Sequence, residues 1–314
     1  MFNFPVGIQL FNRPDYARQM LESMQKQTLP VDTNKLYIFI DGFNGSIYEN
    51  NGATDLTQQV ELISRQIFPN AKVVRQTKNL GIANLRNQLQ SAAFSGSDSW
   101  AAFFEEDLVL DPTYLQELSD LISIVDPYDE VSKVACFQII QSLSSLSRGF
   151  EGFYPVRGTQ AVAERRSFYI FKQPAIKKFI ELIEKDLGNY GQFKNSEIAS
   201  SMASFGYFLT YFQHDSLEEQ IIHSEGKLHV VSKPNLAVDI GIEGIHSYIT
   251  NPIFVQSQPK IETLEIRKQN FKNQLPEVLN ESLAHNREYF AEILDGYHIS
   301  KSRKKMLKKI FKRV

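Results

Sequence analysis

The sequence of 314 residues contains one cysteine and no long apolar run. Cys136 lies in a short apolar segment, so an intramolecular disulfide framework and a cysteine-based metal site are both excluded, and a reducing compartment is expected. No apolar run approaches the length of a membrane span, and the first ten residues lack the basic segment of a secretory signal peptide. We therefore expect a cytoplasmic protein, whose 42% hydrophobic residues are enough to bury a large core.

Two glycine-rich phosphate-binding motifs are also missing. The first apolar segment is not followed by the Gly-x-Gly-x-x-Gly of dinucleotide-binding proteins, and no Gly-x-x-x-x-Gly-Lys-Ser/Thr loop of nucleotide hydrolases occurs. Positive charge is scarce as well. The first 300 residues hold 26 Lys and Arg against 36 Asp and Glu, a net charge of −10. This balance argues against a broad nucleic-acid-binding face.

The first 130 residues alternate between strand and helix patterns. Apolar strands are predicted at residues 4–11, 35–40, 71–75 and 100–104. Helices are predicted from Pro14, from about Leu56 and from Gly81. This alternation predicts a parallel sheet with helices on both faces. Because ligands bind such sheets at the carboxyl ends of the strands, the polar residues that follow the strands form one candidate site: Asn12, Arg13, Asp41, Glu105, Glu106 and Asp107.

The acidic triplet Glu105, Glu106 and Asp107 lies between two apolar segments. Buried carboxylates need a cation or hydrogen-bond donors. If the strand continues through the triplet, Glu105 and Asp107 point to the same face. Such a pair at a strand end suits a hard divalent cation bound to phosphate oxygens. The alternative is a solvated acidic turn before a helix that begins near Pro112.

After residue 130 the pattern becomes irregular. We expect a strand at residues 131–140 and a loop at 142–152 that closes over substrates. Two helices are expected at 174–187 and 215–224, and a further strand at 227–231. The chain from residue 261 onward is predicted to form charged helices divided by Pro276 and Gly296. The predicted organisation is a domain of residues 1–250, with halves at 1–130 and 131–250, and a helical extension at 251–314.

Five segments carry motifs in a fixed order: residues 6–15 with Phe-Asn-Arg-Pro-Asp, 39–42 with Phe-Ile-Asp-Gly, 79–87 with Asn-Leu-Gly and Arg-Asn, 103–108 with the acidic triplet, and 234–247 with Asp-Ile-Gly and Gly-Ile-His-Ser. Together they resemble the GT-A nucleotide-sugar glycosyltransferases of the family 2 type, similar to the N-acetylglucosaminyltransferase I group. The resemblance implies a Rossmann-like α/β fold with a mostly parallel sheet flanked by helices. Its first half would bind the nucleotide sugar, and its second half would bind the acceptor and carry the catalytic base.

The resemblance also implies roles for individual residues. Asp107 and His246 would hold a divalent metal, Mn²⁺ or Mg²⁺. Asp215 would be the catalytic base, although the family's usual neighbouring tryptophan is replaced by His214 and the nearby Glu218 and Glu219 compete for the role. The donor would be bound by the remaining candidates, Asn12, Arg13, Asp41, Arg86, Glu105 and Glu106.

The implied reaction is metal-dependent, inverting transfer of a hexosyl or N-acetylhexosaminyl group in polysaccharide biosynthesis. A nucleoside-diphosphate sugar, with a UDP-sugar as the first expectation, would donate to a hydroxyl of a glycan, glycolipid or protein-linked acceptor. Two alternatives stay open: a nucleotidyltransferase acting on sugar phosphates, and an inactive protein that binds through the sugar-nucleotide fold.

The last fourteen residues, 301–314, carry eight Lys and Arg and no acid. Apolar residues recur among them at helical spacing: Met306, Leu307, Ile310, Phe311 and Val314. A basic amphipathic helix can lie on anionic lipid, which would hold a cytoplasmic enzyme peripherally against the inner face of the membrane. Equally, its apolar stripe can pack on the acidic body of the protein.

Overall fold

The computed structural model describes residues 1–137, 153–155, 160–184, 202, 214–232, 236–241 and 263–296. Three sequence predictions lie outside these residues: the loop at 142–152, the metal ligand His246 and the basic tail at 301–314.

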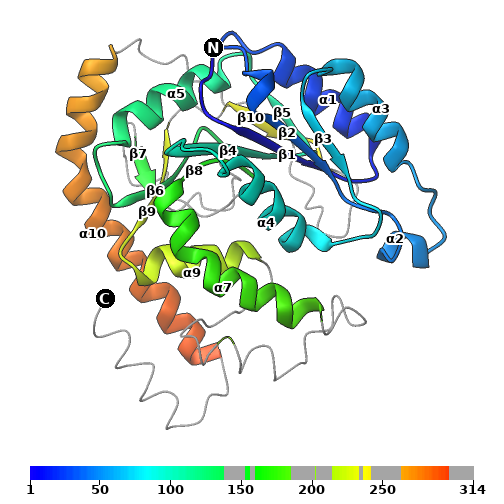
Figure 1. Cartoon of the computed structure of the whole chain (residues 1–314). Coiled ribbons are helices and arrows are strands. Elements are labelled where there is room, and N and C mark those ends of the chain that lie inside the picture. The colour runs from blue at the N-terminus through cyan, green and yellow to red at the C-terminus, as the bar shows by residue number, and fades with distance from the viewer. Residues whose placement is uncertain are drawn as a thin grey trace.

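An eight-stranded mixed sheet forms the centre of the molecule, in the order β3-β2-β1-β4-β8-β6-β9-β7 (Figure 1). The strands are β1 (Val6–Leu10), β2 (Leu36–Ile40), β3 (Lys72–Arg75), β4 (Trp100–Glu105), β6 (Val131–Ala135), β7 (Phe153–Pro155), β8 (Ala161–Arg165) and β9 (Leu228–Ser232). The strands from β3 to β4 are parallel. β8 is antiparallel to both β4 and β6.

Helices cover both faces of this sheet, as Figure 1 shows. Alternate residues of β4 enter different cores, since Phe104 packs on one face and Phe103 on the other. The first face carries helices α1 (Pro14–Gln25), α3 (Thr57–Ile67), α5 (Tyr114–Val125) and α10 (Leu264–Gly296). The second carries α4 (Gly81–Ala93), α7 (Arg166–Glu184) and α9 (His214–Ser224); a short helix, α2 (Ile47–Asn50), lies in the loop after β2. The predicted α/β fold of a sheet flanked by helices, with a helical C-terminal extension, is confirmed.

Close packing explains a glycine in the first strand. A Cβ at Gly7 would lie 2.8 Å from Cδ1 of Phe103 and 2.9 Å from Cγ of Leu89. Because β1 is buried along its whole length, any side chain at this position would force the neighbouring strand or α4 outward. Cys136 is also buried, as its apolar surroundings predicted.

The structure corrects several predicted elements. α7 begins at Arg166 rather than 174, and both α7 and α10 continue through a proline, Pro174 and Pro276 respectively. Proline costs about 3 kcal/mol within a helix, but a buried apolar stripe runs past each one and holds the helix together. Strands β7 and β8 were not predicted.

A second, two-stranded sheet joins distant parts of the chain. β5 (Leu108–Leu110) pairs antiparallel with β10 (Ala237–Asp239), and Asp239 lies opposite Leu108. The segment that contains β10 is therefore held directly beside the acidic triplet. No helix among the described residues is long and apolar enough to cross a membrane.

Candidate active site

Arg13 joins the ends of β1 and β4. The extended strand ends at Glu105, and Glu106 and Asp107 form a turn before β5. The expected alternation through Asp107 is therefore wrong, because the chain has already turned. Instead, Nε of Arg13 donates to Glu106 at 2.6 Å and its Nη2 donates to Asp107 at 3.1 Å. The backbone N–H of Phe11 also donates to Glu106, at 2.7 Å.

Burial and charge act against each other in this group, which we call the Arg13 cluster (Arg13, Glu106 and Asp107). Burial raises the pKa of Glu106, and the charge of Arg13 and the Phe11 N–H partly oppose that rise. Burial disfavours the charged guanidinium of Arg13, but Glu106 and Asp107 outweigh it and raise the pKa of Arg13. One permanent positive charge thus faces two carboxylates, which leaves the cluster with surplus negative charge when both are ionised.

Asp239 reaches the same place from the second half of the chain, and the sequence analysis did not select it. The N–H of Ile240 donates to the Asp107 carbonyl at 2.7 Å. A Cβ at Gly241 would lie 2.9 Å from Oδ1 of Asp239 and 3.0 Å from Oδ2 of Asp107. The two carboxylates therefore flank one point. Burial raises the pKa of Asp239, and the neighbouring charge of Asp107 adds to the rise.

The oxygen atoms here fit a divalent cation. Oδ1 of Asp107 is buried without a hydrogen-bond partner, and Asp239 supplies a second carboxylate beside it. Mg²⁺ and similar cations commonly take one or two carboxylates and complete their coordination with water and substrate phosphate. Within the described part of the chain, no group of three or more potential ligand side chains occurs. His246, the other predicted ligand, lies outside that part.

Asp41 is buried at the end of β2, and four protein groups donate to it. Oδ1 accepts from the N–H groups of Gly42 and Leu80, at 2.9 and 2.8 Å. Oδ2 accepts from the side chain of Asn79 at 3.1 Å and the N–H of Gly81 at 3.0 Å. Burial raises the pKa of Asp41, and the backbone donors oppose that rise. A carboxylate offers about four acceptor positions, so Asp41 here fixes the start of α4.

The other predicted donor-binding residues lie around this edge of the sheet. Asn12 holds the start of α3, because its side chain donates to the Thr54 carbonyl at 2.8 Å and accepts from the Leu56 N–H at 2.6 Å. Arg86 is buried with its guanidinium 4.7 Å from the ring centre of Phe103. Glu105 ends β4 and remains partly exposed.

The three candidate bases lie on α9. Asp215 is in its first turn, and Glu219 is one turn later. Glu218 is buried and bonded to Lys133 and Lys172. Two ammonium groups on its carboxylate leave Glu218 poorly suited to accept a proton from a substrate.

Comparison with known families gives one match, in the first part of the chain. Residues 6–129 match the model of Glycosyl transferase family 2. The match covers β1 to α5, and hence Arg13, Asp41 and the acidic triplet, but not Asp215 or Asp239. It does not distinguish the N-acetylglucosaminyltransferase I group, which stays a prediction. No curated protein matches the chain.

Solved structures give more distant likenesses. The chain shares 17% identity with a crystal structure of S. aureus TarS, covering 54% of this chain and 29% of that one with a TM-score of 0.36. S. aureus TarS 1–349 in complex with UDP-GlcNAc matches 98% of this chain and 71% of that one, with 14% identity and a TM-score of 0.44. The mannosyltransferase PcManGT from Pyrobaculum calidifontis in complex with GDP-Man and Mn²⁺ matches 98% of this chain and 80% of that one, with 14% identity and a TM-score of 0.41. At these TM-scores the solved structures carry no argument, and the family match is confined to residues 6–129.

Proposed function

We propose that the protein is a glycosyltransferase that moves a sugar from a nucleoside-diphosphate sugar to an acceptor hydroxyl. The observation that carries this proposal is the meeting of Arg13, Asp107 and Asp239 at the carboxyl edge of the sheet, within and beside the segment that matches Glycosyl transferase family 2. Donors of the UDP-sugar type come first among those to test. The acceptor would be a glycan, a glycolipid or a protein-linked hydroxyl.

Asp107 and Asp239 would hold a divalent cation, Mn²⁺ or Mg²⁺, with His246 as a further proposed ligand. The bound cation would supply neutralisation of the charge that develops on the diphosphate leaving group. Arg13 keeps the carboxylates in place and contributes positive charge at the same edge. Of the donor-binding candidates, Glu105 is partly exposed, whereas Asp41 acts through the turn that it fixes.

Asp215 would remove the proton from the acceptor hydroxyl as that oxygen attacks the anomeric carbon. Attack from the face opposite the diphosphate inverts the anomeric centre in a single displacement. We favour Asp215 over Glu218 because Glu218 is engaged by two lysines. Proton transfer of this kind contributes a factor of about 10² to 10⁴ in rate.

The decisive experiment is a donor screen. The purified protein is incubated with a panel of UDP- and GDP-sugars and Mn²⁺, with a mixed pool of glycan acceptors, and released nucleoside diphosphate is measured. We expect release with one donor class, its loss in EDTA and its loss in Asp107→Asn. Asp129→Asn, a change at a side chain that is 93% exposed, is the matched control. Release of pyrophosphate from sugar phosphate and nucleoside triphosphate would instead establish a nucleotidyltransferase.

For the tail at 301–314, we propose attachment to anionic lipid. Co-sedimentation with anionic and neutral vesicles at two salt concentrations tests it. Binding should be salt-sensitive, specific to the anionic vesicles and absent after deletion of residues 301–314. Equal sedimentation of the full-length and truncated proteins would instead indicate that the tail has no lipid-binding role.

A further inference from the structure

Four charged side chains meet in the interior of the second half of the chain. We call this group the four-charge cluster: Lys133 of β6, Glu164 of β8, Lys172 of α7 and Glu218 of α9. The side chains of Lys133, Glu164 and Lys172 are fully buried, and that of Glu218 is 2% exposed. Lys172 donates to Glu164 at 2.7 Å and also binds Glu218. Lys133 binds Glu218 and lies 3.9 Å from Glu164.

The sheet register brings the cluster together. Lys133 and Glu164 lie opposite each other on the antiparallel strands β6 and β8, so their side chains share one face of the sheet. Helices α7 and α9 lie side by side over this region (Figure 1) and each supplies one further charge. The ring of Phe168 lies 5.5 and 5.8 Å from the two ammonium groups, which closes the site with apolar surface.

Stability alone does not account for such a cluster. Removing ions from water is costly, and apolar residues of similar size in the place of a buried ion pair are often as stable or more stable. A buried ion pair does, however, penalise every arrangement that separates its members, because each would then be an uncompensated buried charge. The cluster therefore favours one position of α9 relative to β6 and α7.

The position of α9 determines where the proposed base, Asp215, lies. Glu218 lies one turn after Asp215 on this helix. The neighbouring Leu217 belongs to the same apolar cluster as Ala83 in the first turn of α4. Ala83 follows shortly after Gly81, whose N–H donates to Asp41. Helix α7 contacts both α4 and α9, so the beginnings of these two helices are connected through one apolar cluster.

We infer that the ion pairs of Glu218 fix the position of α9 and, through it, hold Asp215 at the reaction centre. This inference rests on the proposed glycosyltransferase function, with Asp215 as the base. Glu218 is then a positioning residue, and Lys133 and Lys172 are the two points to which it is tied.

Two variants separate positioning from stability. Glu218→Gln leaves two buried lysines with one carboxylate, and a large fall in Tm is expected. Lys133→Met/Glu218→Gln restores the charge balance but not the tie between α9 and β6. We expect the double variant to recover most of the Tm, to bind the donor nucleotide with a Kd within about twofold of wild type, and to keep a kcat lowered at least tenfold. Amide hydrogen exchange in α9 should be faster than in wild type.

The outcomes are distinct. If the double variant regains kcat together with Tm, the cluster serves stability only and the inference is wrong. It is also wrong if donor Kd rises in proportion to the loss of kcat, since the nucleotide pocket would then be disturbed. Arg267→Gln/Glu117→Gln removes a pair that ties α10 to α5 and is the control: it should lower Tm without changing kcat or exchange in α9. If wild type transfers no sugar, the proposed function fails, and exchange in α9 alone then decides whether the cluster fixes this helix.

Discussion

The Arg13 cluster and the four-charge cluster use the same chemistry in opposite ways. The Arg13 cluster lies where β1 and β4 end, and the side chain of Arg13 is 30% exposed. It has one cation for two carboxylates, and Oδ1 of Asp107 lacks a partner. The four-charge cluster is sealed from water and has two cations for two carboxylates.

The difference teaches what each cluster can do. A cluster with surplus negative charge and an unpartnered oxygen at a sheet edge can take up a further cation. A cluster with equal numbers of positive and negative charges and no contact with solvent cannot take up a charged ligand. Its charges therefore act only on the helices and strands that carry them. Under the proposed function, the Arg13 cluster, together with Asp239, would bind the donor and its cation, and the four-charge cluster would fix the helix that carries the proposed base.

The largest expected effect tests whether the base is Asp215 rather than Glu219 on the same helix, since Glu218 belongs to the sealed cluster. Asp215→Asn should lower kcat by about 10² to 10⁴ and leave donor Kd and Tm near their wild-type values, since only proton transfer is lost. Steady-state kinetics and nucleotide titration measure these quantities. Glu219→Gln is the matched control on the same helix. If Glu219→Gln shows this pattern and Asp215→Asn does not, the assignment of the base is wrong.

The second prediction concerns the cost of unbalancing the sealed cluster. Lys172→Met leaves two buried carboxylates with Lys133 alone and should lower the free energy of unfolding by about 3 to 5 kcal/mol. Lys172→Met/Glu164→Gln keeps the balance and should recover most of this loss. Arg13→Met, in the half-open cluster, should cost less than Lys172→Met because Asp107 is 17% exposed and the Phe11 N–H still donates to Glu106. Urea unfolding compares the three, and an equal cost for Arg13→Met and Lys172→Met would remove the distinction between the clusters.

The same comparison explains how much of the fold was visible in the sequence. In the first 130 residues β1, β2 and β3 are short strands that alternate with helices, and β4 is an apolar run, so the local pattern was sufficient to predict these four strands. β8 was missed because its last residues, Glu164 and Arg165, are charged although buried. Arg165 is satisfied by backbone carbonyls, including those of Val125 and Val131, and no local pattern reveals such distant acceptors. The start of α7 was missed because Pro174 usually marks a first turn.

The candidate site divides in the same way. Arg13 and Asp107 could be placed together, because parallel strands end at one edge of the sheet. Asp239 could not, since its place depends on the antiparallel pairing of β10 with β5, a contact between distant segments that each contain only three paired residues. Two local signals were present: a carboxylate directly after an apolar segment, and its place in the Asp-Ile-Gly motif of residues 234–247. Asp41 was identified as a strand-end acid, but three of its four donors come from Asn79, Leu80 and Gly81 at the beginning of α4.

The third prediction tests whether Asp107 and Asp239 act together. In Gly241→Ala the new methyl group would lie about 3 Å from both carboxylates and push them apart. The affinity for Mn²⁺, measured by calorimetry without donor, should fall by about 10- to 100-fold, as expected for disturbed support of metal ligands, while Tm changes little. Gly96→Ala is the control, since its Cβ would meet only Oδ2 of Asp98, at 3.6 Å. Unchanged Mn²⁺ affinity in Gly241→Ala would contradict a site between the two carboxylates.

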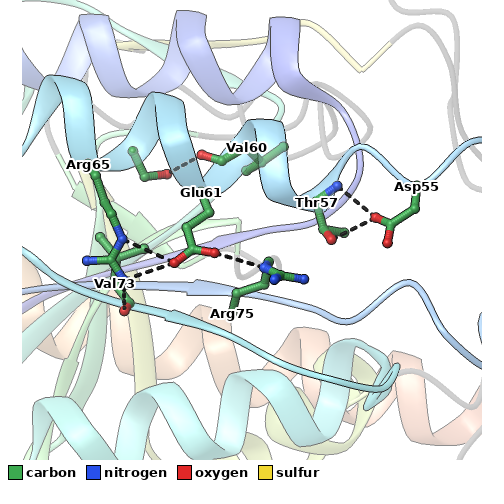
Figure 2. A network of polar contacts seen from close by, with 8 residues as sticks. Asp55, Thr57, Val60, Glu61, Arg65, Val73 and Arg75 are labelled. Atoms are coloured by element: carbon green, nitrogen blue, oxygen red, sulfur yellow. Dashed lines mark hydrogen bonds and ion pairs between the residues drawn. The ribbon is translucent and has the colours of Figure 1, made fainter.

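The smallest effect is expected at a third charged group, on the surface, which completes the series from sealed to open. Figure 2 shows Glu61 of α3 accepting from Arg75 of β3 at 2.8 Å and from Arg65 at 3.0 and 3.1 Å. Hydrogen bonding to Arg75, opposed by slight burial and aided by Arg65, lowers the pKa of Glu61 below 4.5. Because the folded-state pKa is the lower one, this stabilisation is present at neutral pH and is lost as the pH falls through that pKa.

Glu61→Gln should therefore lower the free energy of unfolding by less than about 1 kcal/mol at pH 7, the usual range for exposed ion pairs. As the pH falls through the folded-state pKa of Glu61, the wild type and the variant should converge, because Glu61 then becomes protonated in both the folded and the unfolded chain. Urea unfolding at pH 7 and at a series of lower pH values measures both differences. Glu22→Gln is the control, since the nearest cations lie 3.8 and 3.9 Å from Glu22, and it should cost still less. If Glu61→Gln lowered the free energy of unfolding as much as Lys172→Met, exposure to solvent would not explain the different strengths of these charged groups.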